Sequence, residues 1–291
     1  MQLCGGGGEP LLFASFRYYF NQKTISVIGS QECFDLVDLV YDSSIGDDIL
    51  KEALTALFFY IENSEKKSTV LFDWLPNDTK TKVALERLSE DNIIKYTFEA
   101  IDNVRIPIYK YHSWDDYFKS LSKSVRQNIR TSYNRLKRDN HSLTLNLYFG
   151  NKELPKNVIN KSLSLYLKGQ KTRYNNYGLS HWIHFKYLHY VSKTMREEFS
   201  FHASLQMDGV IIAMMQGYFD NNRKDIQIPR LAIDSEYSFY SPGYLLICET
   251  IKSLFLNNEV DSLDLIRGSE KYKLDLGGEK YQTYKCKIEL L

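Results

Sequence analysis

The apolar positions in the first part of the chain predict both helices and strands. Leu50, Leu54, Leu57 and Ile61 are spaced to form one stripe, so the pattern predicts a helix over 47–61. A second helix is predicted over 80–89. Runs rich in β-branched and aromatic residues predict strands over 11–19, 24–28, 68–74, 93–99 and 105–109. This alternation predicts an α/β unit in the first part of the chain.

A long amphipathic helix is predicted over 113–138. Ser113 is a good N-cap with Asp116 three residues later, and Asp139-Asn140 is a suitable end. One face of this helix is apolar, and its members are Phe118, Val125, Ile129 and Leu136. Another face is a cationic ridge within about a 60° sector, formed by Lys119, Lys123, Arg126, Arg130 and Lys137. The ridge fits an anionic partner such as coenzyme A phosphates, a nucleotide sugar or tRNA, or it is a solvated helix face.

The second part of the chain predicts three antiparallel strands followed by a helix and another strand. The strands are predicted over 200–206, 210–219 and 225–233, and Asp208-Gly209 between the first two is a strong hairpin signal. A helix then begins at Ser241, and strands are predicted over 262–266 and 281–290. This order places the start of a helix directly after an antiparallel meander.

The segment Tyr240-Ser241-Pro242-Gly243 is the first candidate site. Proline fits the first helical turn, and Gly243 removes a side chain where a ligand could approach the backbone. Unpaired N–H groups at the positive end of the helix dipole suit a pyrophosphate. The alternative is a well-capped helix that binds no ligand.

The second candidate site follows the strand predicted over 262–266. Its charged and phenolic residues are Asp264, Arg267, Glu270, Lys271, Tyr272 and Lys273. Ligand crevices form at strand ends in α/β folds. Tyr272 could return a proton to a thiolate, and Glu270 or Asp264 could take one from an amine. The alternative is a polar turn whose charges pair with one another.

Composition narrows the choice of function only modestly. The 291 residues carry a net charge of +1, which favours neither nucleic acid nor anionic membrane. The four cysteines form no C-x-x-C pair, which indicates reduced thiols in a cytosolic protein. His181, His184 and His189 are spaced as on an ordinary helix surface, so no metal site is expected. The longest apolar runs are far shorter than the ~20 residues of a spanning helix, so no membrane insertion is expected.

Three stretches together resemble a known family. They are Lys123 to Arg130, Asp234 to Leu246, and Asp264 to Lys273. In order and spacing they resemble the GNAT-fold proteins of the cellulose-biosynthesis-associated (CelD/BcsL) type, which are related to the Fem aminoacyltransferases. The resemblance covers about 117–273, and the first part of the chain is similar to the family's degenerate N-terminal half more loosely. One departure is Ser269, which stands where the family often has an acid.

The resemblance implies an α/β (α+β) fold of two tandem GNAT-like halves, with mixed, mostly antiparallel sheets flanked by helices. The expected division is a degenerate half at 1–112 and an acyltransferase half at 113–291. The implied activity is acyl transfer from acetyl-CoA or another acyl-CoA to an amine or hydroxyl of a sugar or cell-surface metabolite. Tyr240, Ser241, Gly243 and Tyr244 would bind the donor, with its pyrophosphate at 241–244.

The resemblance, together with the residue types, also suggests roles for the remaining candidate residues. Arg126, Arg130, Arg267 and Lys273 are expected to bind substrate, and Asp264, Glu270 and Tyr272 to act in catalysis. Two rival readings stay open. One is a Fem-like transferase that uses aminoacyl-tRNA, in which the cationic ridge contacts RNA. The other is an inactive GNAT-like domain used for binding or assembly.

Overall fold

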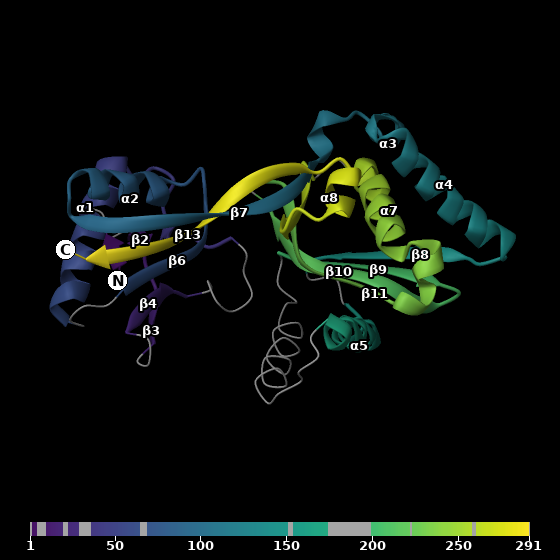
Figure 1. Ribbon diagram of the computed structural model, residues 1–291, viewed down its shortest axis with the longest axis horizontal. Coiled ribbons are helices and arrows are strands. Elements are labelled where there is room, and N and C mark those ends of the chain that lie inside the picture. The colour runs from purple at the N-terminus through teal and green to yellow at the C-terminus, as the bar shows by residue number, and fades with distance from the viewer. Residues whose placement is uncertain are drawn as a thin grey trace. The chain divides into compact units, whose positions relative to one another are not determined.

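The chain forms two compact units and passes between them along two strands. The computed structural model describes residues 2–4, 10–19, 23–28, 36–64, 69–150, 154–173, 199–221, 223–257 and 260–290. The first unit comprises 1–103 with 281–291, and the second comprises 104–280. The chain enters the second unit along β7 (Ile94–Pro107) and returns along β13 (Glu279–Leu290) (Figure 1). Strand β13 belongs to the first unit because it pairs antiparallel with β6 (Thr69–Pro76), and the division expected after residue 112 stays a prediction.

The first unit combines two groups of strands with two helices. Its other elements are β1 (Gln2–Cys4), β2 (Pro10–Phe13), β3 (Phe16–Tyr19), β4 (Thr24–Val27), β5 (Val40–Tyr41), α1 (Asp47–Ser64) and α2 (Lys80–Glu90). Strand β1 pairs with β2 and β2 with β5, while the order β3-β4-β6-β13-β7 forms the main sheet of this unit. The predicted stripe Leu50, Leu54, Leu57 and Ile61 is buried in its core, which confirms the helix and its orientation.

The second unit is built on the predicted meander. Strands β8 (Leu143–Phe149), β9 (Ser200–Met207), β10 (Val210–Asp220) and β11 (Asp225–Ile233) pair antiparallel in sequence order. Strand β12 (Ser262–Arg267) pairs parallel with β11 and lies between it and β7. The sheet is therefore mixed and mostly antiparallel, as expected.

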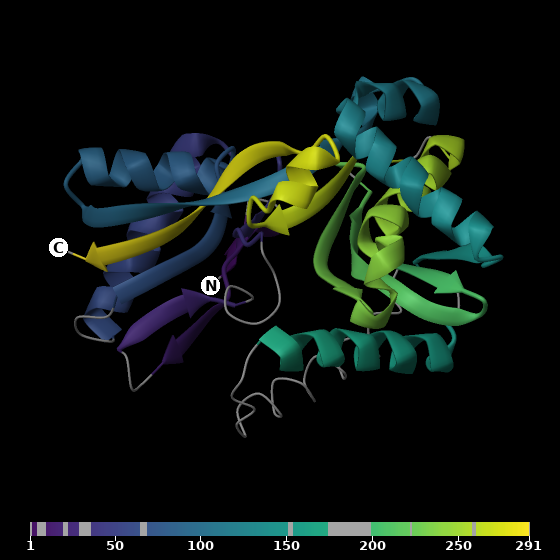
Figure 2. The ribbon, with the colours of Figure 1, turned by 45° about the vertical axis from the view of Figure 1, so that its right-hand side comes forward.

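Helices cover both faces of this sheet. Helix α7 (Pro242–Asn257) starts where the sequence predicts, and its Leu245, Leu246 and Ile251 are fully buried in the larger core. Helix α5 (Lys156–Arg173) packs on the opposite face against β10 and β11 (Figure 2). The unit thus has a helix–sheet–helix arrangement.

The segment 113–138 is two helices, and the single helix expected there is wrong. Helix α3 (Trp114–Ser120) ends at Leu121, whose backbone is extended, and α4 (Lys123–Arg138) follows. Ser122 is the N-cap of α4, because its hydroxyl accepts a hydrogen bond from the Val125 N–H at 3.3 Å. A serine that caps favours a new helix start over an uninterrupted helix. The apolar stripe is confirmed, since Val125, Ile129 and Leu136 are buried.

Several sequence expectations concern segments outside the described residues. These are the three histidines at 181, 184 and 189, and Cys33. The other three cysteines form no disulfide. Across the residues that the structure describes, no helix combines the length and apolar surface needed to cross a bilayer.

Candidate functional site

The parallel strands β11 and β12 separate soon after they meet. Their pairing covers only Asp225–Ser262, Ile226–Leu263 and Gln227–Asp264. Strand β11 continues to Ile233 without β12 as a partner, and Pro229, which has no N–H to donate, occupies this stretch. The two strands therefore diverge toward their carboxyl ends, where ligands bind in α/β folds.

A bulge in β11, opposite Gly217 of β10, lies beside the point of divergence. The register between β10 and β11 shifts between Gln216 and Tyr218. A Cβ on Gly217 would lie 1.8 Å from the carbonyl oxygen of Gln227, so only glycine fits there. Bulges bend strands and increase their twist. The bulge consequently accounts for the turn of β11 away from β12 after Gln227.

The first turn of α7 exposes unpaired backbone donors. The Leu245 N–H donates to the Ser241 carbonyl at 3.2 Å, which closes the helix. Within the described part of the chain, the N–H groups of Gly243 and Tyr244 and the Ser241 hydroxyl have no hydrogen-bond partner. Ser241 has a φ of 53°, a left-handed conformation that is uncommon for residues other than glycine. Groups of this kind at a helix N-terminus could bind an anion.

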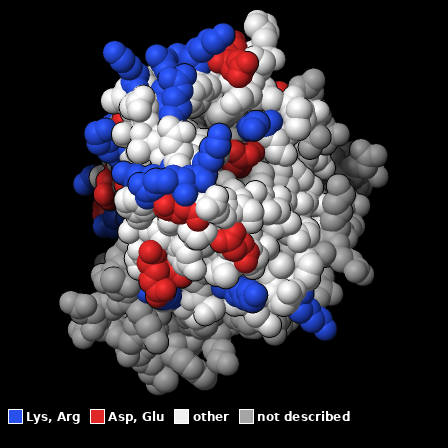
Figure 3. Space-filling model, turned by 90° about the vertical axis from the view of Figure 1, so that its right-hand side faces the viewer, with Lys and Arg blue, Asp and Glu red and all other residues white. Residues whose placement is uncertain are grey.

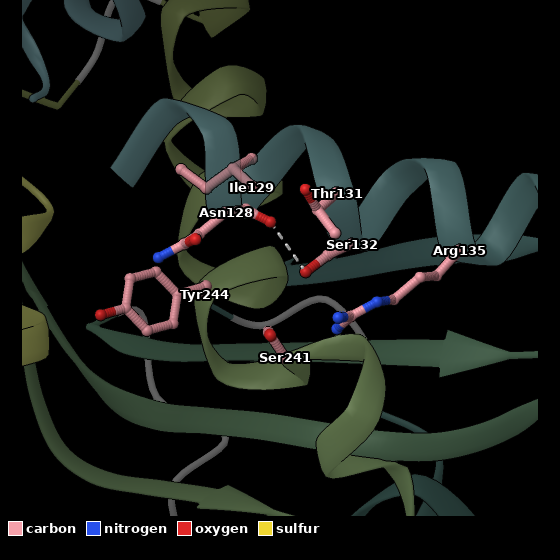
Figure 4. Close-up of a pocket in the computed structure, with 7 residues that line it drawn as sticks. All are labelled: Asn128, Ile129, Thr131, Ser132, Arg135, Ser241 and Tyr244. Carbon is pink, nitrogen blue, oxygen red and sulfur yellow. Dashed lines mark hydrogen bonds between the residues drawn. The ribbon is translucent and has the colours of Figure 1, made fainter. Parts of the chain in front are cut away.

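A cavity of about 150 Å³ adjoins this helix end. Its walls come from α4 and α7, and the lining residues are Asn128, Ile129, Thr131, Ser132, Arg135, Ser241 and Tyr244 (Figure 4). A cavity of this size holds a molecule as large as benzene. None of these lining side chains is acidic. The cavity therefore suits one or two phosphate groups.

Arg135 supplies the positive charge of the cavity. Its Nη1 donates to the Phe239 carbonyl at 2.6 Å, and its guanidinium lies 4.2 Å from the centre of the Phe239 ring. These contacts hold the side chain along α4, pointing toward Ser241 (Figure 4). The guanidinium has five donors in a fixed fork, so the others could bind an anion in the cavity.

The expected ridge cations lie elsewhere on the helices. Lysines and arginines gather over α3 and α4 (Figure 3). Arg126 donates to the carbonyls of Lys119 and Leu121, and so caps the end of α3. Arg130 lies 5.4 Å from the Phe118 ring centre and lines a separate cavity of about 340 Å³ between α3, α4 and α7. Neither arginine lines the cavity at Ser241.

The donor-site candidates separate into two groups. Ser241 and Tyr244 line the cavity, with Gly243 between them in the same turn. Tyr240 instead donates from its hydroxyl to Asp139 at 3.0 Å and packs edge-to-face on His141. It thus links the 3-10 turn before α7, Ser235–Tyr240, to the end of α4.

The turn after β12 is organised by Lys273, which is 3 % exposed. Its Nζ donates to the carbonyls of Ile266, Arg267 and Gly268 at 3.3, 2.6 and 3.1 Å, and lies 3.0 Å from a Glu270 carboxylate oxygen. Buried Ile266 has a φ of 50°, which is strained for a β-branched residue. The Lys273 bonds hold this strained backbone in place.

Glu270 folds back over Gly268 in the same turn. Gly268 has a φ of 92°, and a Cβ there would lie 2.6 Å from the Glu270 carboxylate. Glu270 precedes the short helix α8 (Lys271–Asp275), which carries half-buried Tyr272. The Tyr244 hydroxyl donates to Asp275 at 3.1 Å, which joins the wall of the cavity at Ser241 to α8. The turn therefore brings Glu270 and Lys273 together and leaves Arg267 exposed.

Asp264 belongs to a buried carboxylate pair under the point of divergence. It is fully buried, accepts from the Ile266 N–H at 2.8 Å, and accepts from Arg105 Nη2 at 3.2 Å. Asp225 accepts from the Ser262 hydroxyl and lies 3.5 Å from the same Arg105 nitrogen. Burial, and then the charge of Asp264, raises the pKa of Asp225 to about 6.

The sequence reasoning missed Arg135, Asn128, Thr131 and Ser132 as site residues. They stand at i, i+3, i+4 and i+7 on α4, and form a polar stripe beside the buried one. Their spacing in the sequence predicts one shared helix face, but nothing local distinguishes this face from the cationic ridge as a ligand site. Within the described ranges, no three His, Cys, Asp or Glu side chains form a group that could hold a metal ion.

Several solved structures have a similar fold at low sequence identity. FemX is 12 % identical to this chain with a TM-score of 0.63, and the match covers 100 % of this chain and 87 % of the FemX chain. L-PGS from Bacillus licheniformis is 12 % identical with a TM-score of 0.58, covering 98 % and 82 %. A tandem GNAT protein from the clavulanic acid pathway is 10 % identical with a TM-score of 0.54, covering 98 % and 81 %. At this identity the likeness concerns the fold. No curated protein sequence matches the chain significantly.

Residues 123–274 match the family described as acetyltransferase (GNAT) domain. The match covers more than half of the chain and includes α4, the meander, α7 and the turn that holds Glu270 and Lys273. The fold and the order of its elements agree with this assignment. The chain therefore belongs to the acetyltransferase (GNAT) domain family.

Proposed function

We propose that the protein transfers an acyl group from an acyl-CoA to an amine or hydroxyl acceptor. One observation carries this proposal: Arg135, Ser241 and Tyr244 line one cavity at the first turn of α7, where the N–H groups of Gly243 and Tyr244 have no hydrogen-bond partner within the described residues. A diphosphate is the part of coenzyme A that these donors would recognise. From there, the divergence of β11 and β12 offers unpaired strand edges beside which the thioester arm would lie.

The proposed reaction is direct attack of the acceptor on the thioester carbonyl. The new C–N or C–O bond forms as the C–S bond breaks. Glu270, whose carboxylate is exposed, accepts the acceptor's proton, and Tyr272 protonates the departing thiolate. Asp264 and Lys273, both buried, act here as positioning residues, because their bonds hold the backbone of the turn.

A ligand panel tests this proposal. Coenzyme A at ~100 times its dissociation constant is expected to stabilise the protein by ~2.7 kcal/mol, or several degrees in Tm. Pantetheine, which lacks the diphosphate and the nucleotide, is the matched control and is expected to give a much smaller shift. Equal shifts from the two compounds, or none from either, would contradict a diphosphate site at α7.

A second candidate function is transfer of an aminoacyl group from tRNA. The exposed cations Lys119, Lys123, Arg130 and Lys137 on α3 and α4 favour it, as does the likeness to FemX. Binding of tRNA to these cations would weaken steeply as salt rises. Salt-dependent tRNA binding without any coenzyme A shift would favour this second function over the first.

Within the GNAT family, we also propose that this chain is of the CelD/BcsL type. It rests on the motif order around Arg126, Ser241 and Glu270, and it suggests a sugar or cell-surface metabolite as acceptor.

A further inference from the structure

A row of buried polar side chains crosses the middle of the sheet in the second unit. The strand register pairs His202 of β9 with Gln216 of β10, and Gln216 with Arg230 of β11. Directly paired residues lie on the same face of a sheet. All three are at most 5 % exposed. Such a row is unusual in a core, where charged side chains are rarely buried without partners.

The row lies on the face covered by α5. Met214 and Ala232, each two residues from a member of the row, pack with Val158 and Leu165 of α5. The Ser162 hydroxyl of α5 lies 3.3 Å from His202 Nε2. Helix α7 and its N-terminal cavity are on the opposite face (Figure 2). The row is therefore separate from the proposed diphosphate site.

Three polar atoms along this face have no partner within the described part of the chain. They are Arg230 Nη2, His202 Nδ1 and Ser204 Oγ. Arg230 is 4 % exposed, and its contact is a long bond from Nη1 to Gln216 Oε1 at 3.4 Å. No carboxylate of the described residues forms an ion pair with it. A buried cation without an anion is strongly unfavourable, so a fold that keeps one indicates a missing anionic ligand.

Arg230 lies on β11 just beyond the point where β11 and β12 diverge. Arg230 follows Gln227, the last β11 residue paired with β12, by three residues, about 10 Å along the strand. It therefore lies where β12 no longer covers the edge of β11. A donor bound from the α7 face and a molecule bound to Arg230 from the α5 face would approach each other at this divergence.

We propose that Arg230, with His202 and Ser204, forms the subsite for an acceptor that carries a carboxylate or phosphate group. The Arg230 guanidinium pairs with the anion, and Ser204 Oγ and His202 Nδ1 bond to its oxygens or to neighbouring polar groups. Burial lowers the pKa of His202 to about 4, so the imidazole is neutral and Arg230 alone supplies the charge. The acceptor role rests on the proposed transferase function, whereas binding of the anion does not.

The first experiment needs no ligand. Thermal unfolding of the Arg230→Met variant is compared with that of Arg105→Met, in which the lost guanidinium has two carboxylate partners. Because Arg230 lacks an anion, R230M is expected to melt at or above the wild-type Tm, while R105M melts well below it. An equal fall in the two variants would overturn the proposal, because Arg230 would then be a structural residue.

The second experiment uses acetate, succinate and inorganic phosphate as probes at constant ionic strength, with chloride as reference. At least one probe is expected to raise the wild-type Tm by roughly 2–4 °C. R230M should lose this rise, and R230K, which keeps the charge, should retain part of it. The proposal is wrong if no probe acts, or if R230M responds like the wild type.

Coenzyme A is included as a separate arm of the same experiment. It is expected to shift R230M as much as the wild type, because its proposed site is on the other face. A coenzyme A shift without an Arg230-dependent anion shift refutes the subsite and leaves the transferase proposal standing. The reverse result refutes the diphosphate site and leaves the anion site standing.

Discussion

Replacing Arg105 by methionine is expected to lower the free energy of unfolding by about 3 kcal/mol, the lower end for a broken buried pair. Arg105 lies 3.2 Å from Asp264 and 3.5 Å from Asp225, whose side chains are 0 % and 2 % exposed. The variant leaves two carboxylates close together and buried without a cation. The lower value applies because 35 % of the Arg105 side chain is exposed to solvent.

The loss in R105M is expected to depend on pH. The pKa of Asp225 is raised to about 6 in the folded protein, from an ordinary value of 3.8. Its contribution to stability is therefore fully present below about pH 4 and is lost as the pH rises through 6. Arg105 holds this pKa down, so without it the pKa rises further. Both proteins lose this contribution alike up to about pH 6, so the gap in stability between wild type and variant should stay nearly constant from about pH 4.5 to about pH 5.5 and widen from about pH 6 to about pH 8.

Urea unfolding at these pH values measures the effect. Lys161→Met is the control, because Lys161 is exposed on α5. The account would be contradicted if R105M lost no more free energy of unfolding than this control, or if the difference between R105M and wild type narrowed with rising pH. Other groups would then stabilise the two carboxylates. The buried pair would then not hold the base of the diverging strands.

Replacing Arg135 by glutamine is expected to weaken coenzyme A binding by roughly 10- to 100-fold. A hydrogen bond to a charged group contributes ~1.5–3 kcal/mol, and each 1.4 kcal/mol is tenfold in affinity. Arg135 is the only cation that lines the cavity at Ser241 in the described residues. Glutamine keeps a polar side chain there but removes the charge. Isothermal titration with coenzyme A measures the change.

The matched control is Lys137→Gln, two residues along α4. Lys137 is exposed and does not line the cavity, so its replacement removes the same charge from the surface. It should change affinity only slightly. Equal losses in the two variants would indicate a general electrostatic attraction, and no loss in Arg135→Gln would remove the guanidinium from the site. The Tm of Arg135→Gln is measured alongside, because the variant also loses the Phe239 contact.

Local sequence signals were sufficient for the framework of the second unit. The Asp208-Gly209 turn, the alternating apolar runs and Pro242-Gly243 located the meander and the start of α7. These features depend on turn chemistry and periodicity, which neighbouring residues determine. The cap at Ser122 was missed because Ser113 already offered a plausible start, and the residues between them fit one helix.

Contacts between residues far apart in the sequence determine which charged side chains reach the candidate site, and the sequence pattern does not predict these contacts. The number of cations on α4 indicated Arg126 and Arg130 as ligand residues, but the fold uses Arg126 to cap α3 and places Arg135 beside Ser241. Likewise Asp264 was visible as a carboxylate at a strand end, whereas its partners Arg105 and Asp225 come from other strands. Such pairings depend on strand order, which periodicity does not specify.

The central claim is that the first turn of α7 binds the diphosphate of a thioester carrier. Nuclear magnetic resonance of the backbone amides during titration tests it most directly. With coenzyme A, the Gly243 and Tyr244 amide resonances are expected to shift strongly, because their N–H groups gain an acceptor. With pantetheine they should stay close to their original positions. Coenzyme A binding that leaves both amides unmoved would contradict the account.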